Sequence, residues 1–259
     1  MFRDSLKSEF SALVSLPLFF SREDTRLNIL AIDTSSASGS IALSNDKRLV
    51  AELTVSEAGA HAEWLLKSID SFLSAIGSSI SDVDFFAVTN GPGSFTGLRI
   101  GVSAVKGLAW STGKKAVGVS ALKALSLNLA YSERPVCPVL DARKGEVYSA
   151  LFKPSGGVIE EILPETAMTP PALIDALSVL NLPAPPVFIG DGLKAYGDIF
   201  KEKVAGASFA HETFWRIRAS NIALLAIPEC GQDGDPRDLT PVYLRKSEAE
   251  IRALADKSK

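Results

Sequence analysis

The loop after the first predicted strand gathers side chains that could hold a phosphate group. It reads Asp33-Thr34-Ser35-Ser36-Ala37-Ser38-Gly39, directly after the apolar run 28–32. Hydroxyls and backbone N–H groups in such a turn can cradle a phosphate, and the Asp33 carboxylate could orient a hydrated Mg²⁺ ion. A serine-rich hairpin turn has the same composition. Asp33, Thr34, Ser35 and Ser36 are therefore candidate nucleotide-binding residues, with a structural turn as the alternative.

A glycine-rich loop, Gly91-Pro92-Gly93-Ser94-Phe95-Thr96-Gly97, is a second candidate anion site. It joins a predicted buried strand at 85–89 to a predicted helix at 95–112, and free N–H groups at a helix N-terminus attract anions. It is not a Walker A loop, because Leu98-Arg99 stands where a Lys-Ser/Thr pair would follow the glycines. Glycines also permit a tight strand-to-helix turn, so both interpretations stand.

The histidines and cysteines do not form a recognisable metal or catalytic site. The chain has two histidines, His61 and His211, so a three-histidine metal site is excluded. A helical histidine pair would need its second ligand four residues after His61, where Leu65 stands. Cys137 and Cys230 are too few for a disulfide framework and indicate free thiols in a reducing compartment. No serine, histidine and acid follow a hydrolase motif, so we predict no catalytic residue and no bound metal.

Two similar halves of the chain must position these candidates. The first half predicts strands at 28–33, 40–43 and 48–55, a helix from about residue 60, then the strand and helix named above. The second half repeats this order, with strands at 136–140, 146–152 and 158–163, a helix at 171–180, a strand at 187–189 and a helix opened by Gly190-Asp191-Gly192. We therefore predict a duplicated α/β fold of the actin-like (ASKHA, ribonuclease H-like) class, each lobe a mixed sheet flanked by helices. The predicted lobes are 27–132 and 133–248.

Composition limits the classes of function. With 259 residues, 46% hydrophobic and 22% charged, the chain should fold, and a net charge of −3 provides no positive field for independent nucleic-acid binding. Residues 1–26 do not match the rest: the apolar run 10–20 is too short to span a membrane, and Pro17 interrupts it. We predict an N-terminal extension outside the fold, a polar tail at 249–259, no membrane partner and a cytoplasmic protein.

Five segments together resemble the TsaB family, also called YeaZ. They are 29–36 (ILAIDTSS), 61–66 (HAEWLL), 90–101 (NGPGSFTGLRIG), 139–148 (VLDARKGEVY) and 241–245 (PVYLR). The likeness covers residues 28–245, and the N-terminal extension departs from it. It implies a non-catalytic subunit for the synthesis of N6-threonylcarbamoyladenosine at position 37 of tRNA. Members of this group also carry the labels glycoprotease-like and peptidase M22-like.

The resemblance also implies partners and an interface. TsaB proteins pair with TsaD, which carries the metal-binding histidines and transfers the threonylcarbamoyl group; they support recruitment of the ATPase TsaE and form homodimers when TsaD is absent. It implies contact with tRNA mainly through the complex, no intrinsic cofactor, and ATP or ADP at or near the partner interface. The paired helices of the first lobe would bundle with those of TsaD, so Val102→Arg should abolish binding without unfolding the chain. The implied interface residues are Ala62, Leu65, Leu66, Ile69, Gly97, Leu98, Arg99, Gly101, Val102 and Val105.

Glycines on the helix at 95–112 agree with a close helix contact. Each interior glycine costs a helix about 1 kcal/mol relative to alanine, so Gly97, Gly101 and Gly107 indicate that another element comes close. The neighbour could be the helix bearing His61 or a second subunit.

Three other functions remain open on the sequence. An ATP-dependent small-molecule kinase of the same fold would need a carboxylate base, for which Asp33, Asp141 and Asp191 are available. A metallopeptidase is disfavoured by the missing ligands. A simple homodimeric scaffold is the third alternative.

Overall fold

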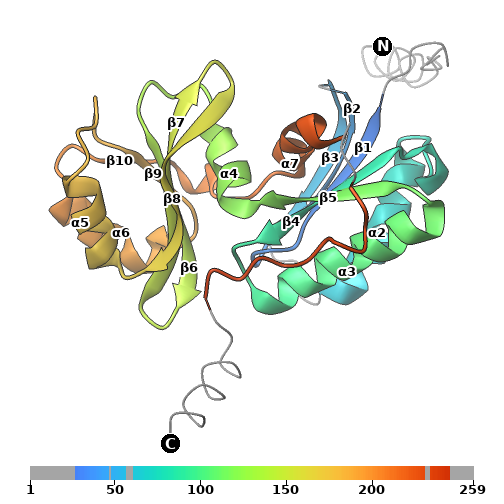
Figure 1. Ribbon diagram of the computed structural model, residues 1–259, viewed down its shortest axis with the longest axis horizontal. Helices are drawn as coiled ribbons and strands as arrows, with labels where there is room; N and C mark the ends of the chain where they lie inside the picture. The colour runs from blue at the N-terminus through green and yellow to red at the C-terminus, as the bar shows by residue number, and fades with distance from the viewer. Residues whose placement is uncertain (1–26, 47, 57–60, 231–233, 246–259) are drawn as a thin grey trace, which may run out of the picture.

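The computed structural model describes residues 27–46, 48–56, 61–230 and 234–245, and of residues 61–63 the backbone alone. These residues form two lobes, each built on a five-stranded sheet with helices against both faces (Figure 1). The predictions for residues 1–26 and for the tail at 249–259 lie outside the described residues.

The first lobe carries one sheet in the order β3-β2-β1-β4-β5. β1 pairs antiparallel with β2 and parallel with β4. Helices α2 and α3 cover one face and helix α7 the opposite face (Figure 1). The elements are β1 (Asn28–Asp33), β2 (Gly39–Asn45), β3 (Arg48–Val55), α2 (His61–Ala75), η1 (Ile80–Asp82), β4 (Phe85–Gly91), α3 (Phe95–Thr112), β5 (Lys115–Ser120) and α7 (Ala219–Ala226).

The second lobe has the same topology, since its sheet order is β10-β9-β6-β7-β8 and β6 takes the place of β1. Gly91 is the last residue of β4 and Gly190 directly follows the corresponding strand β9, and both have positive φ, 144° and 124°. The predicted duplication is therefore confirmed. The elements are α4 (Ala121–Ser126), η2 (Leu127–Leu129), β6 (Val136–Arg143), β7 (Glu146–Ser155), β8 (Val158–Met168), α5 (Pro170–Ser178), β9 (Val187–Ile189), α6 (Leu193–Lys203), β10 (Ser208–Phe209), η3 (Glu212–Phe214) and η4 (Ile227–Glu229).

The predicted boundary between the lobes needs correction, because residues 219–230 and 234–243 pack on the first lobe. Helix α7 contacts β1 and β2, although it follows the second lobe in the chain. Glu52 of β3 holds its start, accepting hydrogen bonds from Arg218 Nε and from the Ser220 amide and hydroxyl, each at 2.9 Å. Helix α4, between the lobes, contacts β6 and β7 of the second sheet. One apolar cluster includes residues of both sheets, so the lobes share a core.

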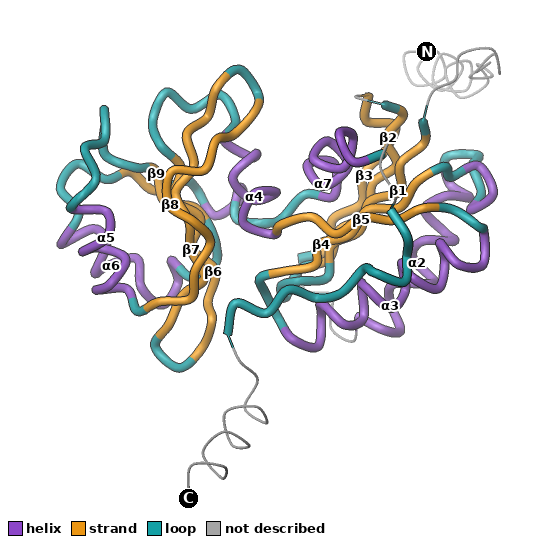
Figure 2. The backbone as a smooth tube through the Cα atoms, in the orientation of Figure 1, coloured by secondary structure: helices purple, strands orange, loops and turns teal. Residues whose placement is uncertain are grey.

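Residues 234–245, called here the C-terminal strap, run along the first lobe toward the second (Figure 2). The Ala116 amide donates to the Gly234 carbonyl at 3.0 Å, and the Val242 amide donates to the Asn90 carbonyl at 2.6 Å. Between these points the Lys106 ammonium of α3 donates to the Leu239 carbonyl at 3.2 Å. The strap is therefore tied to β5, α3 and the end of β4.

Candidate functional site

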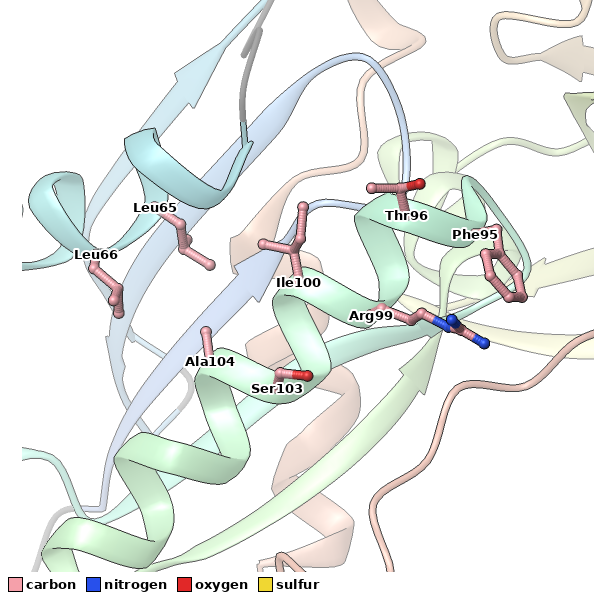
Figure 3. A pocket seen from close by; sticks show the side chains of 8 residues that line it. All are labelled: Leu65, Leu66, Phe95, Thr96, Arg99, Ile100, Ser103 and Ala104. Carbon is pink, nitrogen blue, oxygen red and sulfur yellow. The ribbon is translucent and has the colours of Figure 1, made fainter.

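Helices α2 and α3 leave an open groove between them, with a volume of about 590 Å³ (Figure 3). Leu65 and Leu66 extend from α2 toward α3, and Phe95 and Arg99 lie at one end. Leu65 is buried and forms part of the floor, whereas Leu66 is 56% exposed. The residues lining this α2–α3 groove are Leu65, Leu66, Phe95, Thr96, Arg99, Ile100, Ser103 and Ala104.

One face of α3 continues the groove toward the end of the helix. Thr96, Ile100, Ser103, Gly107 and Trp110 recur at spacings of three and four, which places them along one side, the outer stripe of α3. Trp110 is 69% exposed. A Cβ added to Gly107 would meet no atom within 4 Å, so no contact among the described residues explains this glycine. An exposed tryptophan beside an unexplained helical glycine is typical of a surface that another helix covers.

Four of the predicted interface residues are buried within the first lobe. Ile69, Val102 and Val105 are 4%, 3% and 0% exposed and belong to the apolar cluster under α2 and α3, and Leu98 is 1% exposed. An amphipathic helix puts its most apolar side against its own core, so this part of the interface stays a prediction. Val102→Arg would bury a charge, and we therefore expect it to destabilise the isolated chain.

Two of the predicted interface glycines, Gly97 and Gly101, are explained by a contact inside the first lobe. A Cβ at Gly97 would overlap the carbonyl oxygen of Thr34, and one at Gly101 would overlap the Thr34 hydroxyl. A Cβ at Gly93 would overlap the Ser35 carbonyl oxygen. The glycine-rich loop and the start of α3 thus pack tightly on the loop after β1, and not on a second helix. Of the remaining predicted interface residues, Leu65, Leu66 and Arg99 line the groove, and the Ala62 side chain lies outside the described residues.

The candidate nucleotide loop is an internal hydrogen-bond network. Asp33 Oδ1 accepts from the Ser35 amide at 3.0 Å, the Ser35 hydroxyl at 2.6 Å and the Thr89 hydroxyl at 2.5 Å. The Thr34 hydroxyl donates to the Gly97 carbonyl at 2.8 Å. Asp33, Thr34 and Ser35 are buried, and Ser36 is half-buried with its hydroxyl 2.9 Å from that of Ser38. This geometry favours the structural turn, and nucleotide binding here stays a prediction.

The carboxylates considered for a kinase do not lie ready for catalysis. Asp33 is fully enclosed in the first lobe and has no surface through which to reach a substrate. In the second lobe the Asp141 amide donates to Asp191 Oδ1 at 3.3 Å, and Arg143 lies 3.3 Å from Asp141 Oδ2. Burial raises the pKa of Asp191 above the usual carboxyl range. Asp191 lies two residues before α6, and the kinase alternative loses its first-lobe base because Asp33 is buried.

Among the described residues, no three His, Cys, Asp or Glu side chains are grouped to hold a metal ion. The His61 side chain lies outside the described residues. No helix within the described range has both the length and the apolar character that crossing a bilayer requires.

The duplicated sheet order, with a helix pair on one lobe and α4 between the lobes, defines the actin-like class of α/β proteins. The family model described as TsaD, tRNA N6-adenosine threonylcarbamoyltransferase, matches residues 50–253. The TsaB protein of Bacillus subtilis is 31% identical over 232 residues, covering 87% of this chain and 97% of the relative. Escherichia coli TsaB is 34% identical over 182 residues, which cover 68% of this chain and 76% of that relative. The solved structure of YeaZ from Pseudomonas aeruginosa superposes with a TM-score of 0.69 at 26% identity, covering 84% of this chain and 100% of that one.

The chain therefore belongs to the TsaB (YeaZ) family, as the five sequence segments predicted.

Proposed function

We propose that this chain is the non-catalytic partner of a TsaD-type threonylcarbamoyltransferase in tRNA threonylcarbamoyladenosine biosynthesis. The Bacillus subtilis relative, of which this chain covers 97%, carries the name of that biosynthesis. The observation that carries the proposal is the α2–α3 groove, continued by the outer stripe of α3. It is the surface where the resemblance implies a helix bundle with TsaD.

The groove has the chemistry of a helix-docking surface. Leu66, Ile100 and Ala104 offer apolar area, and Gly107 permits a partner backbone to come close. Arg99 stands at one end with its guanidinium 3.7 Å from the centroid of the Phe95 ring. A helix pair with an apolar face would remove this surface from water. A second copy of the chain would use the same groove when TsaD is absent.

The division of labour follows from what the groove and the loops provide. Four residues after His61, where a second helical metal ligand would stand, Leu65 is buried in the groove floor. The Asp33 carboxylate and the Thr34 and Ser35 hydroxyls bind within the fold. These observations agree with the resemblance, which implies that the transferase chemistry, the metal and most of the tRNA contact fall to TsaD and that ATP hydrolysis falls to TsaE.

Reconstitution tests this proposal. The purified chain is combined with TsaD, TsaE, tRNA and threonylcarbamoyl-adenylate, and modified tRNA is measured. Omitting this chain should abolish modification, and Ser103→Arg in the groove should reduce it at least about tenfold, because a long charged side chain would fill the docking surface. Ser178→Arg makes the same change on exposed α5 of the second lobe and should have no effect.

Two results would contradict the proposal. One is full modification without this chain. The other is phosphotransfer or threonylcarbamoyl transfer by this chain alone, which would restore the enzymatic alternatives.

A further inference from the structure

One end of the α2–α3 groove is built partly by the C-terminal strap. The Tyr243 ring stacks on that of Phe95, with centroids 4.9 Å apart and an interplanar angle of 29°. The Tyr243 hydroxyl accepts a hydrogen bond of 3.0 Å from Arg99 Nε. Phe95 and Arg99 both line the groove, so Tyr243 holds in place the two side chains that close this end.

Two residues further on, the strap reaches the second lobe. Arg245 donates from Nη1 to the Ala142 carbonyl at 3.1 Å, and its Nε lies 3.4 Å from a carboxylate oxygen of Glu146. Its side chain is 25% exposed, so solvent screens this ion pair less than it would on an open surface. Two residues of extended chain span at most about 7 Å. The groove end and the β6–β7 hairpin are therefore tied to one short piece of backbone.

The strap is also fixed at the residue before Tyr243. The Val242 amide donates to the Asn90 carbonyl at 2.6 Å, and a Cβ at Gly91 would overlap the Val242 carbonyl oxygen. The strap cannot slide here without breaking that contact. If Phe95 or Arg99 moves, Tyr243 should move with it, and the short segment from Tyr243 to Arg245 should shift Arg245 as well.

We infer that the C-terminal strap couples occupancy of the α2–α3 groove to the placement of the second lobe, with Tyr243 and Arg245 as positioning residues. Docking at the groove and the position of the second lobe are then linked, and each biases the other by the same factor. The identity of the docking protein rests on the proposed function, but the link inside the chain does not.

The first arm of the test uses the isolated chain. Spin labels are attached at Ser111→Cys on α3 and Ser178→Cys on α5, both exposed positions, with Cys230 replaced by serine. Cys137 stays, because burial raises the pKa of its thiol to about 12 and protects it from labelling. Electron–electron distances are measured for the intact strap, Tyr243→Ala, Arg245→Ala and the control Val242→Ala, whose side chain is 47% exposed. Tyr243→Ala and Arg245→Ala should broaden or shift the distance distribution. Val242→Ala should reproduce the distribution of the intact strap.

The second arm measures affinity for TsaD by calorimetry. Arg245 contacts the second lobe and does not line the groove, so a purely local role predicts no change in affinity. The coupling predicts that Arg245→Ala weakens binding roughly fivefold or more. Tyr243→Phe keeps the ring stack and loses the hydrogen bond to Arg99. Its affinity for TsaD should therefore lie between that of the intact chain and that of Tyr243→Ala.

The outcomes separate the two proposals. Identical distance distributions in all variants would overturn the coupling, whether or not TsaD binds. Altered distances with unchanged affinity for TsaD would also overturn it, because the strap would then only brace the lobes. If the intact chain does not bind TsaD at all, the proposed function fails, and the distances decide whether the strap links the groove end to the second lobe.

Discussion

Replacing Gly107 by alanine should stabilise the isolated chain and weaken its docking. Gly107 lies in the interior of α3, where glycine costs about 1 kcal/mol relative to alanine. An added methyl group meets no atom within 4 Å, so nothing in the described fold opposes this gain. Unfolding should therefore require about 0.5–1 kcal/mol more, which for a chain of this size raises Tm by roughly 1–4 °C.

Docking should respond in the opposite direction. If a partner helix packs closely against Gly107, the new Cβ overpacks the contact at a cost of about 1–3 kcal/mol. This corresponds to a loss of affinity for TsaD of roughly 5-fold to 150-fold. Thermal unfolding and calorimetry on the same preparation measure both effects.

A second glycine on the same helix provides the control. At Gly97 the added Cβ would overlap the Thr34 carbonyl oxygen, so Gly97→Ala should lower Tm. A lower Tm for Gly107→Ala, as for Gly97→Ala, would show that Gly107 has a close neighbour within the fold. A raised Tm with unchanged affinity for TsaD would show that no partner helix packs against Gly107.

Three further predictions concern neighbouring features. Val102→Arg should unfold or strongly destabilise the chain by burying a charge, whereas Ser103→Arg on the exposed side should leave Tm within a few degrees of the unsubstituted chain. Equal Tm values for the two variants would contradict the assignment of the two faces of α3. Glu52→Ala should lower the free energy of unfolding by roughly 1.5–3 kcal/mol, because α7 loses the carboxylate that accepts from Arg218 and Ser220. Denaturant titration measures this, and an unchanged midpoint would count against that anchor. Burial keeps Asp191 protonated to higher pH in the folded chain than in the unfolded chain, so stability should fall as pH rises from about 3.8 through the raised pKa. Asp191→Asn should remove this dependence of stability on pH. If the dependence persists in the variant, another titrating group causes it.

The fold was largely predictable from the sequence, because the duplicated pattern of strands and turns repeats visibly. In each half, an apolar run that ends at an aspartate, Asp33 or Asp141, indicates the first strand. Gly91 and Gly190 lie at the ends of the equivalent strands β4 and β9. Helix α7 was missed, since Ala219–Ala226 is short and apolar on nearly every side and so has no helical polar face. Its position on the first sheet depends on the long-range contact with Glu52, which no local pattern reveals.

The location of the site was predictable as a helix pair, but the face was not. The prediction chose the most apolar residues of α3, such as Leu98 and Val102, and these are buried within the fold. Phe95, Thr96, Ile100, Ser103, Ala104 and Trp110 were missed as groove or stripe residues. The spacing of the outer stripe could have identified them, because its members other than Ile100 are small, polar or aromatic and lie on the other side of α3 from Val102 and Val105.

The loop of Asp33 to Ser36 shows a second limit of sequence reasoning. Hydroxyls and a carboxylate after a buried strand suit a phosphate and an internal turn equally well. The choice depends on which groups come from elsewhere in the chain, here the Thr89 hydroxyl and the Gly97 carbonyl. Neither partner is close in sequence.

Hydroxyl-radical footprinting of the chain with and without TsaD tests the docking surface most directly. Leu66, Phe95 and Trp110 are 56%, 39% and 69% exposed and should lose oxidation in the complex. Tyr131, which is 85% exposed and lies outside the groove, should be oxidised equally in both states. Unchanged oxidation of Leu66, Phe95 and Trp110 in a complex that forms would contradict docking on α2 and α3.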